Sequence, residues 1–320
     1  MTNILLLTNK GDVTTDFIVE RFHERDVPFY RLNTEEISKS VELTFDINSN
    51  TFLLYDKILR RDIDLSTFTA VYFRRPELPS IDASLNDGER DFVASEFTGV
   101  LEGIYQILRK AFWVSNVYAI RKSENKIFQL IIAQELGFKI PPSLISNSFK
   151  NASLFYSTQQ DCILKPIRVG RVPGDKDKII FTTRLQTFPA NAMEIESCPQ
   201  CFQKEIRKAA DIRVTVIGRK VFAAMIHSQD GEETITDWRR GSVPLHHTTH
   251  QLPQPVELLC IELVSLLELS FGAIDLVLDE SGEYFFLEIN PNGQWGWIEN
   301  QLGLDISGEI VNLLCNGYNK

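Results

Sequence analysis

Short strand-like runs and helical patterns alternate through the first third of the chain. Strands are predicted where β-branched and other apolar residues cluster, and helices where apolar residues recur every three or four positions. On this basis we expect strands at 3–8, 28–32, 70–74 and 112–115, and helices at 13–25 and 86–110. Strands that alternate with helices indicate an α/β layer. We assign this layer to an amino-terminal domain at residues 1–118.

The remaining two thirds of the chain continue the same mixture of elements. Apolar residues recur with helical spacing at 122–136, 256–269 and 307–315. Strands are predicted at 162–165, 179–183, 202–206, 213–216 and 221–227. We therefore expect an α/β fold throughout, with a central domain at residues 119–200 and a carboxy-terminal domain at residues 201–320.

Two apolar runs at 272–279 and 284–290 flank a turn and predict a β-hairpin. If Asp279 lies opposite Tyr284, the antiparallel register places Asp275 across from Glu288 and returns Asn290 to the same face. The residues on the other face form the expected core side: Ile274, Leu276, Leu278, Phe285, Leu287 and Ile289.

The carboxylates of this hairpin are its candidate chemistry. Asp275 and Glu288 repel each other at such a separation unless a cation lies between them. With Asn290 they offer three oxygen ligands, which suit Mg²⁺, an ion that usually shares its coordination shell with substrate phosphates. The hairpin therefore predicts a magnesium site and a phosphate partner. A solvated hairpin with acidic residues on its wet face is the alternative.

Composition narrows the class of protein. The 320 residues carry a formal net charge of −10, and 43% of them are hydrophobic. An acidic chain of this kind argues against a general nucleic-acid or anionic-membrane surface, so we expect neither partner. No apolar run approaches the length that spans a bilayer, and we expect a cytoplasmic protein. Five scattered cysteines favour free thiols over a disulfide framework.

An ordered series of motifs runs through residues 119–320. Its members, in chain order, are Lys126, Lys165, Glu205, Asp211, Arg213, Asp275, Glu288 and Asn290. Each motif alone is weak, but the ordered set is a strong signal. In this order the chain resembles the ATP-grasp superfamily. The resemblance implies an ATP-grasp fold of three α/β subdomains, with ATP and Mg²⁺ bound between the second and the third.

The resemblance implies a nucleotide-binding role for four of these residues. Lys126 and Lys165 correspond to two lysines that hold nucleotide phosphates. Glu205 corresponds to the position where the hinge strand meets adenine, and Asp211 to a position near the ribose. A solvated strand end is the structural alternative for Lys165.

The other four motif residues correspond to the catalytic and metal positions of the family. Arg213 resembles the arginine that contacts the transferring phosphoryl group, while Asp275, Glu288 and Asn290 match the metal ligands. These roles agree with the chemistry, because phosphoryl transfer is catalysed mainly by positioning and by cations that neutralise charge. Arginine offers a rigid donor fork for that purpose. A surface ion pair of small worth is the alternative for Arg213.

Three further segments carry a closer resemblance. They are Tyr-Phe-Arg-Arg-Pro at 72–76, Asp-Trp-Arg-Arg at 237–240 and Asn-Pro-Asn-Gly-Gln-Trp-Gly-Trp at 290–297. These segments resemble the microviridin-type, or graspetide, ligases, which close ω-ester or ω-amide rings in ribosomal precursor peptides. In that family ATP phosphorylates an Asp or Glu side chain of the precursor, and a Ser or Thr hydroxyl or a Lys amine displaces the phosphate. The implied partner is a precursor peptide with a leader and an acidic core rich in Thr and Ser.

The same segments supply the residues that we assign to the peptide. The arginines would attract an acidic core, and the tryptophans would wall its channel. The alternatives are solvated arginine pairs and buried aromatic packing. The assigned residues are Arg74, Arg75, Arg239, Arg240, Trp295 and Trp297.

Two other functions stay open. One is a ligase of the same superfamily that adds amino acids to a protein or peptide by amide bonds, and the other is a non-catalytic, ATP-dependent peptide-binding protein. We favour a macrocyclase that forms esters, because the family more often uses hydroxyl nucleophiles. Cys198 and Cys201 have redox or half-zinc spacing, but the chain has no second pair of this kind and the two residues lead into the hinge strand. The histidines at 246, 247 and 250 suggest a metal cluster, but we favour a polar active-site loop, because the metal expected at the hairpin is hard and prefers oxygen ligands. Ring number, leader contacts and a homodimer are left open.

Overall fold

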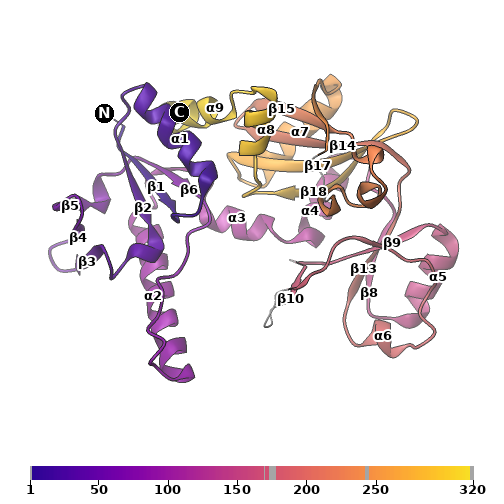
Figure 1. Ribbon diagram of the computed structural model, residues 1–320, viewed down its shortest axis with the longest axis horizontal. Helices are drawn as coiled ribbons and strands as arrows, with labels where there is room; N and C mark the ends of the chain where they lie inside the picture. The colour runs from indigo at the N-terminus through magenta and orange to yellow at the C-terminus, as the bar shows by residue number, and fades with distance from the viewer. Residues whose placement is uncertain (1, 169, 173–177, 242–244, 318–320) are drawn as a thin grey trace. The chain divides into compact units, whose positions relative to one another are not determined.

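A computed structural model describes residues 2–168, 170–172, 178–241 and 245–317. The chain divides into two compact units (Figure 1). Unit 1 comprises Met1–Ile120, Leu269–Phe271 and Gln294–Lys320, and unit 2 comprises Arg121–Glu268 and Gly272–Gly293. Each unit thus combines segments that are distant in the sequence. The division into three domains at residues 118 and 200 stays a prediction.

Unit 1 is built on a parallel sheet in the order β2-β1-β6-β7. Its strands are β1 (Ile4–Thr8), β2 (Phe29–Asn33), β6 (Ala70–Phe73) and β7 (Phe112–Val114). All five residues of β1 are buried, as expected for a strand inside a parallel sheet that is covered on both faces. The four strands predicted from the sequence are therefore confirmed.

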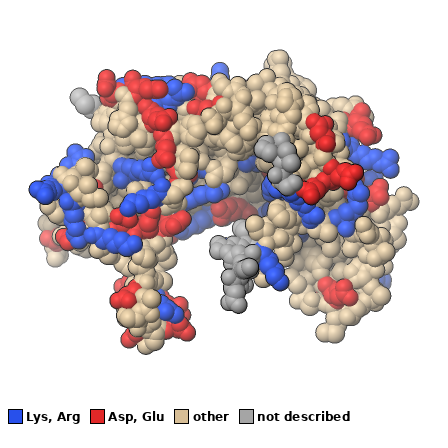
Figure 2. Space-filling model, in the orientation of Figure 1, with Lys and Arg blue, Asp and Glu red and all other residues tan. Residues whose placement is uncertain are grey.

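Three helices of unit 1 begin and end close to the predicted positions, namely α1 (Val13–Glu24), α2 (Asp87–Ile107) and α9 (Ile306–Asn316). Helix α8 (Gly296–Leu302) and the start of α3 (Val117–Ser123) lie outside the predicted helices. A capping box of Asn86 and Glu89 starts α2, because each side chain bonds the other's backbone N–H. Acidic side chains gather at this end of the helix (Figure 2), with Asp87 and Glu89 in its first turn.

A second, antiparallel sheet of unit 1 was not predicted. It contains β3 (Val41–Asp46), β4 (Thr51–Asp56) and β5 (Arg61–Asp64) in that order. The turns at 47–50 and 57–60 contain no Asn-Gly, Asp-Gly or Gly-Gly pair, which is the strongest hairpin signal, and only the first of them carries Asn and Ser residues. Asn50 and Arg60 instead adopt the positive φ values of 55° and 53° that these turns require.

The first sheet of unit 2 has the order β12-β9-β13-β8. Its strands are β8 (Ser143–Ser146), β9 (Cys162–Lys165), β12 (Thr183–Arg184) and β13 (Gln200–Lys204), and α5 (Phe149–Gln159) and α6 (Met193–Glu196) accompany it. The buried side chains of Ala152, Ile195 and Phe202 form its core. Strand β13 corresponds to the strand predicted at 202–206, at the start of the carboxy-terminal domain. Because β13 pairs with both β8 and β9, it belongs to this sheet instead.

One predicted strand in this region is wrong. Instead of a continuous strand at 179–183, the chain forms β11 (Lys178–Ile179), which pairs with β10 (Arg171–Val172), and then β12. Between β11 and β12, the backbone of Thr182 bonds to side chains. Its N–H donates to Asp237 at 3.4 Å, and its carbonyl accepts from Arg240 at 2.7 Å. These bonds occupy the groups that a strand ladder would need.

The second sheet of unit 2 has the order β16-β15-β14-β17-β18. Its strands are β14 (Lys208–Ile217), β15 (Lys220–Ile226), β16 (His247–His250), β17 (Phe271–Asp279) and β18 (Tyr284–Asn290), with helices α4 (Lys126–Glu135) and α7 (Gln254–Leu266). The single helix predicted at 122–136 is two helices. Asn125 breaks it, because its side chain accepts the N–H of Phe128 and caps α4.

The hairpin of β17 and β18 follows the predicted register only at its open end. Asp275 pairs with Glu288 there, as expected. Near the turn, Leu278 rather than Asp279 pairs with Tyr284. A shift of register after Asp275 reconciles the two ends, because β18 carries one extra residue.

The extra residue changes which side chains reach the core. Phe286, rather than Leu287, pairs with Leu276, and Phe286 is fully buried while Phe285, which we expected on the core side, is only half-buried. Leu287 lines a cavity instead of the core. Ile274 and Ile289 are buried as predicted. Within the described residues, no helix is both long enough and apolar enough to cross a bilayer.

Candidate active site

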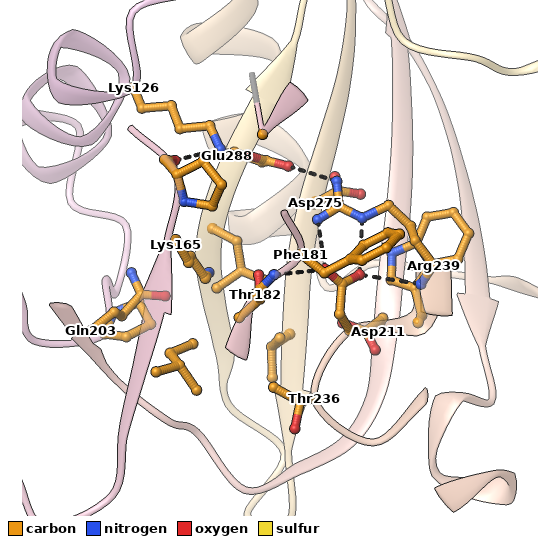
Figure 3. Close-up of a pocket in the computed structure, with 18 of the residues that line it drawn as sticks. Lys126, Lys165, Phe181, Thr182, Gln203, Asp211, Thr236, Arg239, Asp275 and Glu288 are labelled. Carbon is orange, nitrogen blue, oxygen red and sulfur yellow. Dashed lines mark hydrogen bonds and ion pairs between the residues drawn. The ribbon is translucent and has the colours of Figure 1, made fainter. Parts of the chain in front are cut away.

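A cavity of about 660 Å³ lies in unit 2 and is lined by the four-stranded sheet, the five-stranded sheet and α4. Such a volume suits a small-molecule ligand. Apolar residues form part of its wall, among them Ile163, Ile180, Phe181, Ile206 and Ile235. Charged side chains converge elsewhere in the cavity, as Figure 3 shows for Lys126, Lys165, Asp211, Arg239, Asp275 and Glu288. An apolar wall beside clustered charges provides places for a base and for phosphates.

Asp275 and Glu288 face each other across the paired strands and both line the cavity. Burial raises the pKa of Asp275 above its ordinary value. The guanidinium of Arg213 opposes this effect, since its Nη1 donates to Asp275 Oδ1 at 2.7 Å, whereas the charge of Glu288 adds to it. A cation beside the two carboxylates would relieve the strain of ionising both.

Glu288 is surrounded by cations. Its Oε2 lies 2.9 Å from Lys126 Nζ, and its Oε1 lies 3.5 Å from Arg239 Nη1. Burial alone would raise the pKa of Glu288, but the charges of Lys126, Arg239 and Lys165 outweigh it and lower the pKa to about 2. Glu288 is therefore ionised at neutral pH.

The donor set of the hairpin fits a magnesium ion. Two carboxylates and the Asn290 carboxamide line one cavity, and hard oxygen donors are the ligands that Mg²⁺ prefers. Asn290 Oδ1 accepts the N–H of Asn292 at 3.0 Å and keeps a second lone pair.

The alternative metal sites gain no support. Among the described residues, no group of three or more His, Cys, Asp and Glu side chains is placed to hold a metal. Cys198 is exposed while Cys201 is buried. His246 stacks on His227 with ring centroids 4.9 Å apart, and His250 hydrogen-bonds the Tyr284 hydroxyl at 2.8 Å.

The two lysines assigned to phosphate both reach the cavity. Lys126 is the first residue of α4, and its Nζ also donates to the Pro166 carbonyl at 3.3 Å. Lys165 ends β9. Burial lowers the pKa of Lys165, and Lys126 lowers it further, although Glu288 opposes them. Within the described parts of the chain the Lys165 ammonium has no hydrogen bond or ion pair, so it can serve an anionic ligand (Figure 3).

Glu205 and Asp211 also line the cavity, but each already has a cationic partner. Glu205 accepts two hydrogen bonds from Arg184, at 2.6 and 2.8 Å. Asp211 is buried and accepts from Lys208 Nζ at 2.6 Å. Their roles at adenine and ribose stay predictions.

Arg213 lies behind Asp275 rather than in the cavity wall, and only 6% of it is exposed. Gly293 leaves the space that the Arg213 side chain occupies. A Cβ on Gly293 would lie 2.8 Å from Arg213 Nη2 and 2.3 Å from the Cβ of Ala273, so no larger residue fits without displacing its neighbours.

The two arginines after Trp238 have different positions. Arg239 is held by Asp237, which accepts from its Nε at 2.9 Å and its Nη2 at 3.1 Å, and its Nη1 reaches toward Glu288. Arg240 instead bonds the Thr182 carbonyl and stacks on the Phe181 ring at 5.5 Å. Only Arg239 lines the cavity, and Arg240 secures the segment between β11 and β12.

The remaining residues assigned to the peptide lie in unit 1. Arg74 is buried, because its Nε bonds Asp12 at 3.2 Å and its Nη2 bonds Gln294 at 3.0 Å. An open surface position that attracts an acidic peptide does not agree with this burial, and the assignment of Arg74 to the peptide stays a prediction. Arg75 is exposed.

Trp295 and Trp297 also belong to unit 1, but their side chains are buried to different extents. Trp295 is fully buried, and its ring contacts Phe17 edge to face at 5.8 Å. The alternative of aromatic packing therefore describes Trp295 better than a channel wall does. Trp297 is half-buried.

Several residues of the cavity wall were missed in the sequence. They include Glu124, Gln129, Phe181, Thr182, Thr236 and Asp237. Asp237 is the first residue of the Asp-Trp-Arg-Arg segment, from which we chose only the arginines, so the sequence did point to its position. Gln129 had only a faint signal, namely its place one turn after Lys126 on the same helix.

Two family models match successive parts of the chain. The MvdD pre-ATP grasp domain matches residues 3–121, and the RimK-like ATP-grasp domain matches residues 124–314. Among curated proteins, N-acetylaspartylglutamate synthase A of Homo sapiens is 24% identical over 150 residues. That stretch is 46% of this chain and 38% of the human protein, so the chain spans well under half of this relative.

Two solved structures resemble nearly the whole chain. A RiPP-associated ATP-grasp ligase from Chryseobacterium gregarium, in complex with ADP and a leader and core peptide, is 27% identical with a TM-score of 0.87. The match covers 99% of this chain and 97% of that one. Macrocyclase MdnB from Microcystis aeruginosa MRC is 30% identical with a TM-score of 0.80, over 98% of this chain and 99% of that one.

Proposed function

Because this chain belongs to the RimK-like ATP-grasp family, we propose that it activates Asp or Glu side chains of a ribosomal precursor peptide as acyl phosphates. Thr and Ser hydroxyls then close ω-ester macrocycles. The chain is an ATP-dependent ligase of the graspetide type and uses ATP with Mg²⁺. The peptide substrate is supported by the Chryseobacterium gregarium complex with its leader and core peptide.

One observation carries the proposal. Asp275 and Glu288, paired across β17 and β18, share a cavity with the ammonium groups of Lys126 and Lys165. Two carboxylates for a metal beside two lysines for phosphates are what a ligase that transfers a phosphoryl group needs.

The side chains of the cavity divide the work of the reaction. Lys126 and Lys165 bind the nucleotide phosphates. When bound by Asp275, Glu288 and Asn290, Mg²⁺ would neutralise charge on the phosphate oxygens.

The three other motif residues act on the transferring group and on the nucleoside. Arg213 stabilises the transferring phosphoryl group once it exchanges its bond to Asp275 for a bond to phosphate. Glu205 and Asp211 orient the base and ribose.

The substrate peptide is acidic, and the cavity arginine closest to Glu288 is suited to hold it. Arg239 is held by Asp237 but remains about half exposed, with 49% of its side chain accessible. A guanidinium fixed on one side and open on the other can bind a carboxylate in a defined orientation. We therefore keep Arg239 as a peptide contact, and Arg75 and Trp297 as weaker candidates.

The decisive test is incubation with a candidate precursor, ATP and Mg²⁺, followed by mass spectrometry. Rings remove one water each, whereas addition of amino acids raises the mass. Peptide-dependent phosphate release separates both ligases from a non-catalytic peptide-binding protein.

One observation favours the amino-acid-adding ligase as the second candidate. N-acetylaspartylglutamate synthase A matches this chain over 150 residues, although at 24% identity. The matched stretch is short, and the likeness to MdnB covers nearly the full chain. The macrocyclase is therefore the better supported function. A cytoplasmic location and a homodimer stay predictions.

A further inference from the structure

Gln129 is a buried polar residue of the cavity wall to which the chemistry above assigns no role. It lies on α4, and only 3% of it is exposed. Its Nε2 donates to the Ser123 carbonyl at 2.6 Å and to the Ile289 carbonyl at 2.8 Å. Its Oε1 accepts the N–H of Ile289 at 3.1 Å. Because both donors and the acceptor are engaged, the carboxamide is held in one orientation.

Ile289 lies between Glu288 and Asn290 on β18, the last strand of its sheet. One side of β18 pairs with β17. The N–H and carbonyl of Ile289 point to the other side, where Gln129 meets both of them. The carboxamide of Gln129 thus takes the place of a neighbouring strand at this one position.

A second bond holds the same edge of β18 on the other side of Glu288. The N–H of Phe286 donates to the Lys139 carbonyl at 2.8 Å. Between Phe286 and Ile289 the strand carries the extra residue that shifts its register. A bulge interrupts the strand ladder locally, so the backbone around Glu288 depends on these two bonds for its position.

Helix α4 contacts Glu288 in two ways. Lys126 Nζ lies 2.9 Å from the Glu288 carboxylate, and Gln129, three residues later, bonds the backbone of the next residue. Residues three apart lie on the same face of a helix. A single rigid turn of α4 therefore relates the lysine to the hairpin.

We propose that Gln129 is a positioning residue that fixes Glu288 and Asn290 relative to Lys126. The separation between bound Mg²⁺ and the nucleotide phosphates is then set by one helical turn. This inference rests on the proposed function, because it takes Glu288 and Asn290 as metal ligands and Lys126 as a phosphate ligand.

The test variant is Gln129→Glu, which keeps the size of the side chain but turns a carboxylate toward two carbonyl oxygens. Binding of a non-hydrolysable ATP analogue is measured by calorimetry with and without Mg²⁺. We expect the Mg²⁺-dependent gain in affinity to fall on the order of 10-fold, with the Mg²⁺-free affinity changed less than about twofold.

Gln200→Glu is the matched control. Gln200 Nε2 also donates to a backbone carbonyl, that of Glu194 at 2.7 Å, but it does not line the cavity. Its replacement should leave the Mg²⁺ dependence unchanged. A Gln129→Glu protein with a lower melting temperature but the unaltered protein's Mg²⁺ dependence would overturn the proposal, because a purely structural role predicts that result.

If Gln129→Glu does not fold, Gln129→Met removes the hydrogen bonds without adding a charge and should show the same loss. Hydrogen exchange on the unaltered protein gives a further measurement. The Ile289 amide should exchange slowly although it lies on a sheet edge, and rapid exchange would contradict the proposal.

Failure of the proposed function has a different signature. If the unaltered protein binds the analogue with Mg²⁺ but modifies no peptide, the macrocyclase assignment is wrong. The comparison between Gln129→Glu and Gln200→Glu still decides the role of Gln129 in that case.

Discussion

The ammonium of Lys126 lies 2.9 Å from the carboxylate of Glu288, so a lysine assigned to phosphate neutralises a carboxylate assigned to metal. Arg213 and Asp275 form a second pair of the same kind, at 2.7 Å. If the nucleotide bound without Mg²⁺, or Mg²⁺ without the nucleotide, one member of each ion pair would lose its partner. A buried charge without a partner is costly in free energy. We therefore expect ATP and Mg²⁺ to bind together.

Glu288→Gln should abolish turnover and leave the fold intact. A neutral amide binds Mg²⁺ more weakly than a carboxylate does, and it no longer balances the charge of Lys126. Peptide-dependent phosphate release and the melting temperature are the measurements. Glu283→Gln is the control, because Glu283 lies in the turn of the same hairpin, half exposed and paired with Lys139. Near-normal product formation by Glu288→Gln would rule out this metal site.

Arg213→Ala should lower kcat by on the order of 10²-fold or more, with ATP affinity little changed, because its guanidinium acts most strongly on the transferring group. Steady-state kinetics and nucleotide titration separate the two effects. Arg219→Ala removes an exposed arginine from the same sheet's β14–β15 turn and should change neither value. A loss confined to ATP binding would argue against the catalytic role.

Gly293→Ala should destabilise the protein and impair turnover together. The added Cβ would meet Ala273 at 2.3 Å and Arg213 at 2.8 Å. Overpacking of this kind costs about 1–3 kcal/mol of unfolding free energy, and displacement of Arg213 should reduce kcat.

Gly99→Ala should stabilise the protein, whereas the same substitution at Gly293 should destabilise it. Gly99 lies inside α2 and has no heavy atom within 4 Å of the added Cβ. Alanine should raise the unfolding free energy by roughly 0.5–1 kcal/mol, because glycine disfavours helix interiors. Chemical denaturation measures both variants, and an unaffected Gly293→Ala protein would contradict the packing described here.

Arg74→Ala and Arg75→Ala should differ sharply although the residues are adjacent. Removing Arg74 leaves the buried Asp12 carboxylate unpaired and should cost about 3–5 kcal/mol. Arg75 is exposed, so its loss should change stability by less than about 0.5 kcal/mol. If Arg74→Ala raised the KM for the peptide without lowering the melting temperature, Arg74 would be a substrate contact after all.

Incubation with the correct precursor, ATP and Mg²⁺ should give products lighter by about 18 Da per ring, as activation brings a hydroxyl next to an acyl phosphate. One ATP should be consumed for each ring. Mild base should hydrolyse ester rings and restore the linear mass, and rings that survive base would be amides. Heavier products would favour the amino-acid-adding ligase, and tight binding without any mass change would favour a binding protein.

Local pattern was sufficient to predict much of the fold. The apolar run of β1 and the spacing of α1 have their information in adjacent residues, so both elements were predicted within about one residue. The pairing of Asp275 with Glu288 was also predicted, because alternation of period two is a local property. Asp279 was misplaced, since nothing in the sequence reveals the extra residue in β18.

Tertiary partners decided what the sequence could not reveal. Gln129 bonds Ile289, which is 160 positions away, and Arg74 bonds Gln294, which is 220 positions away. The arginines at 74 and 75 look alike in the sequence, yet one is buried beside Asp12 and the other is exposed. Such differences depend on contacts that form only when distant segments meet.

The bonds that Gln129 and Lys139 make to β18 also affect the tendency of the protein to aggregate. An outer strand with free N–H and carbonyl groups invites pairing with another chain and is a common start of aggregation. Here the outward N–H of Phe286 and both outward groups of Ile289 are already occupied within the molecule. The strand that carries Glu288 is thereby shielded from strand exchange at high protein concentration, where an enzyme built on an open edge would lose material to insoluble assemblies.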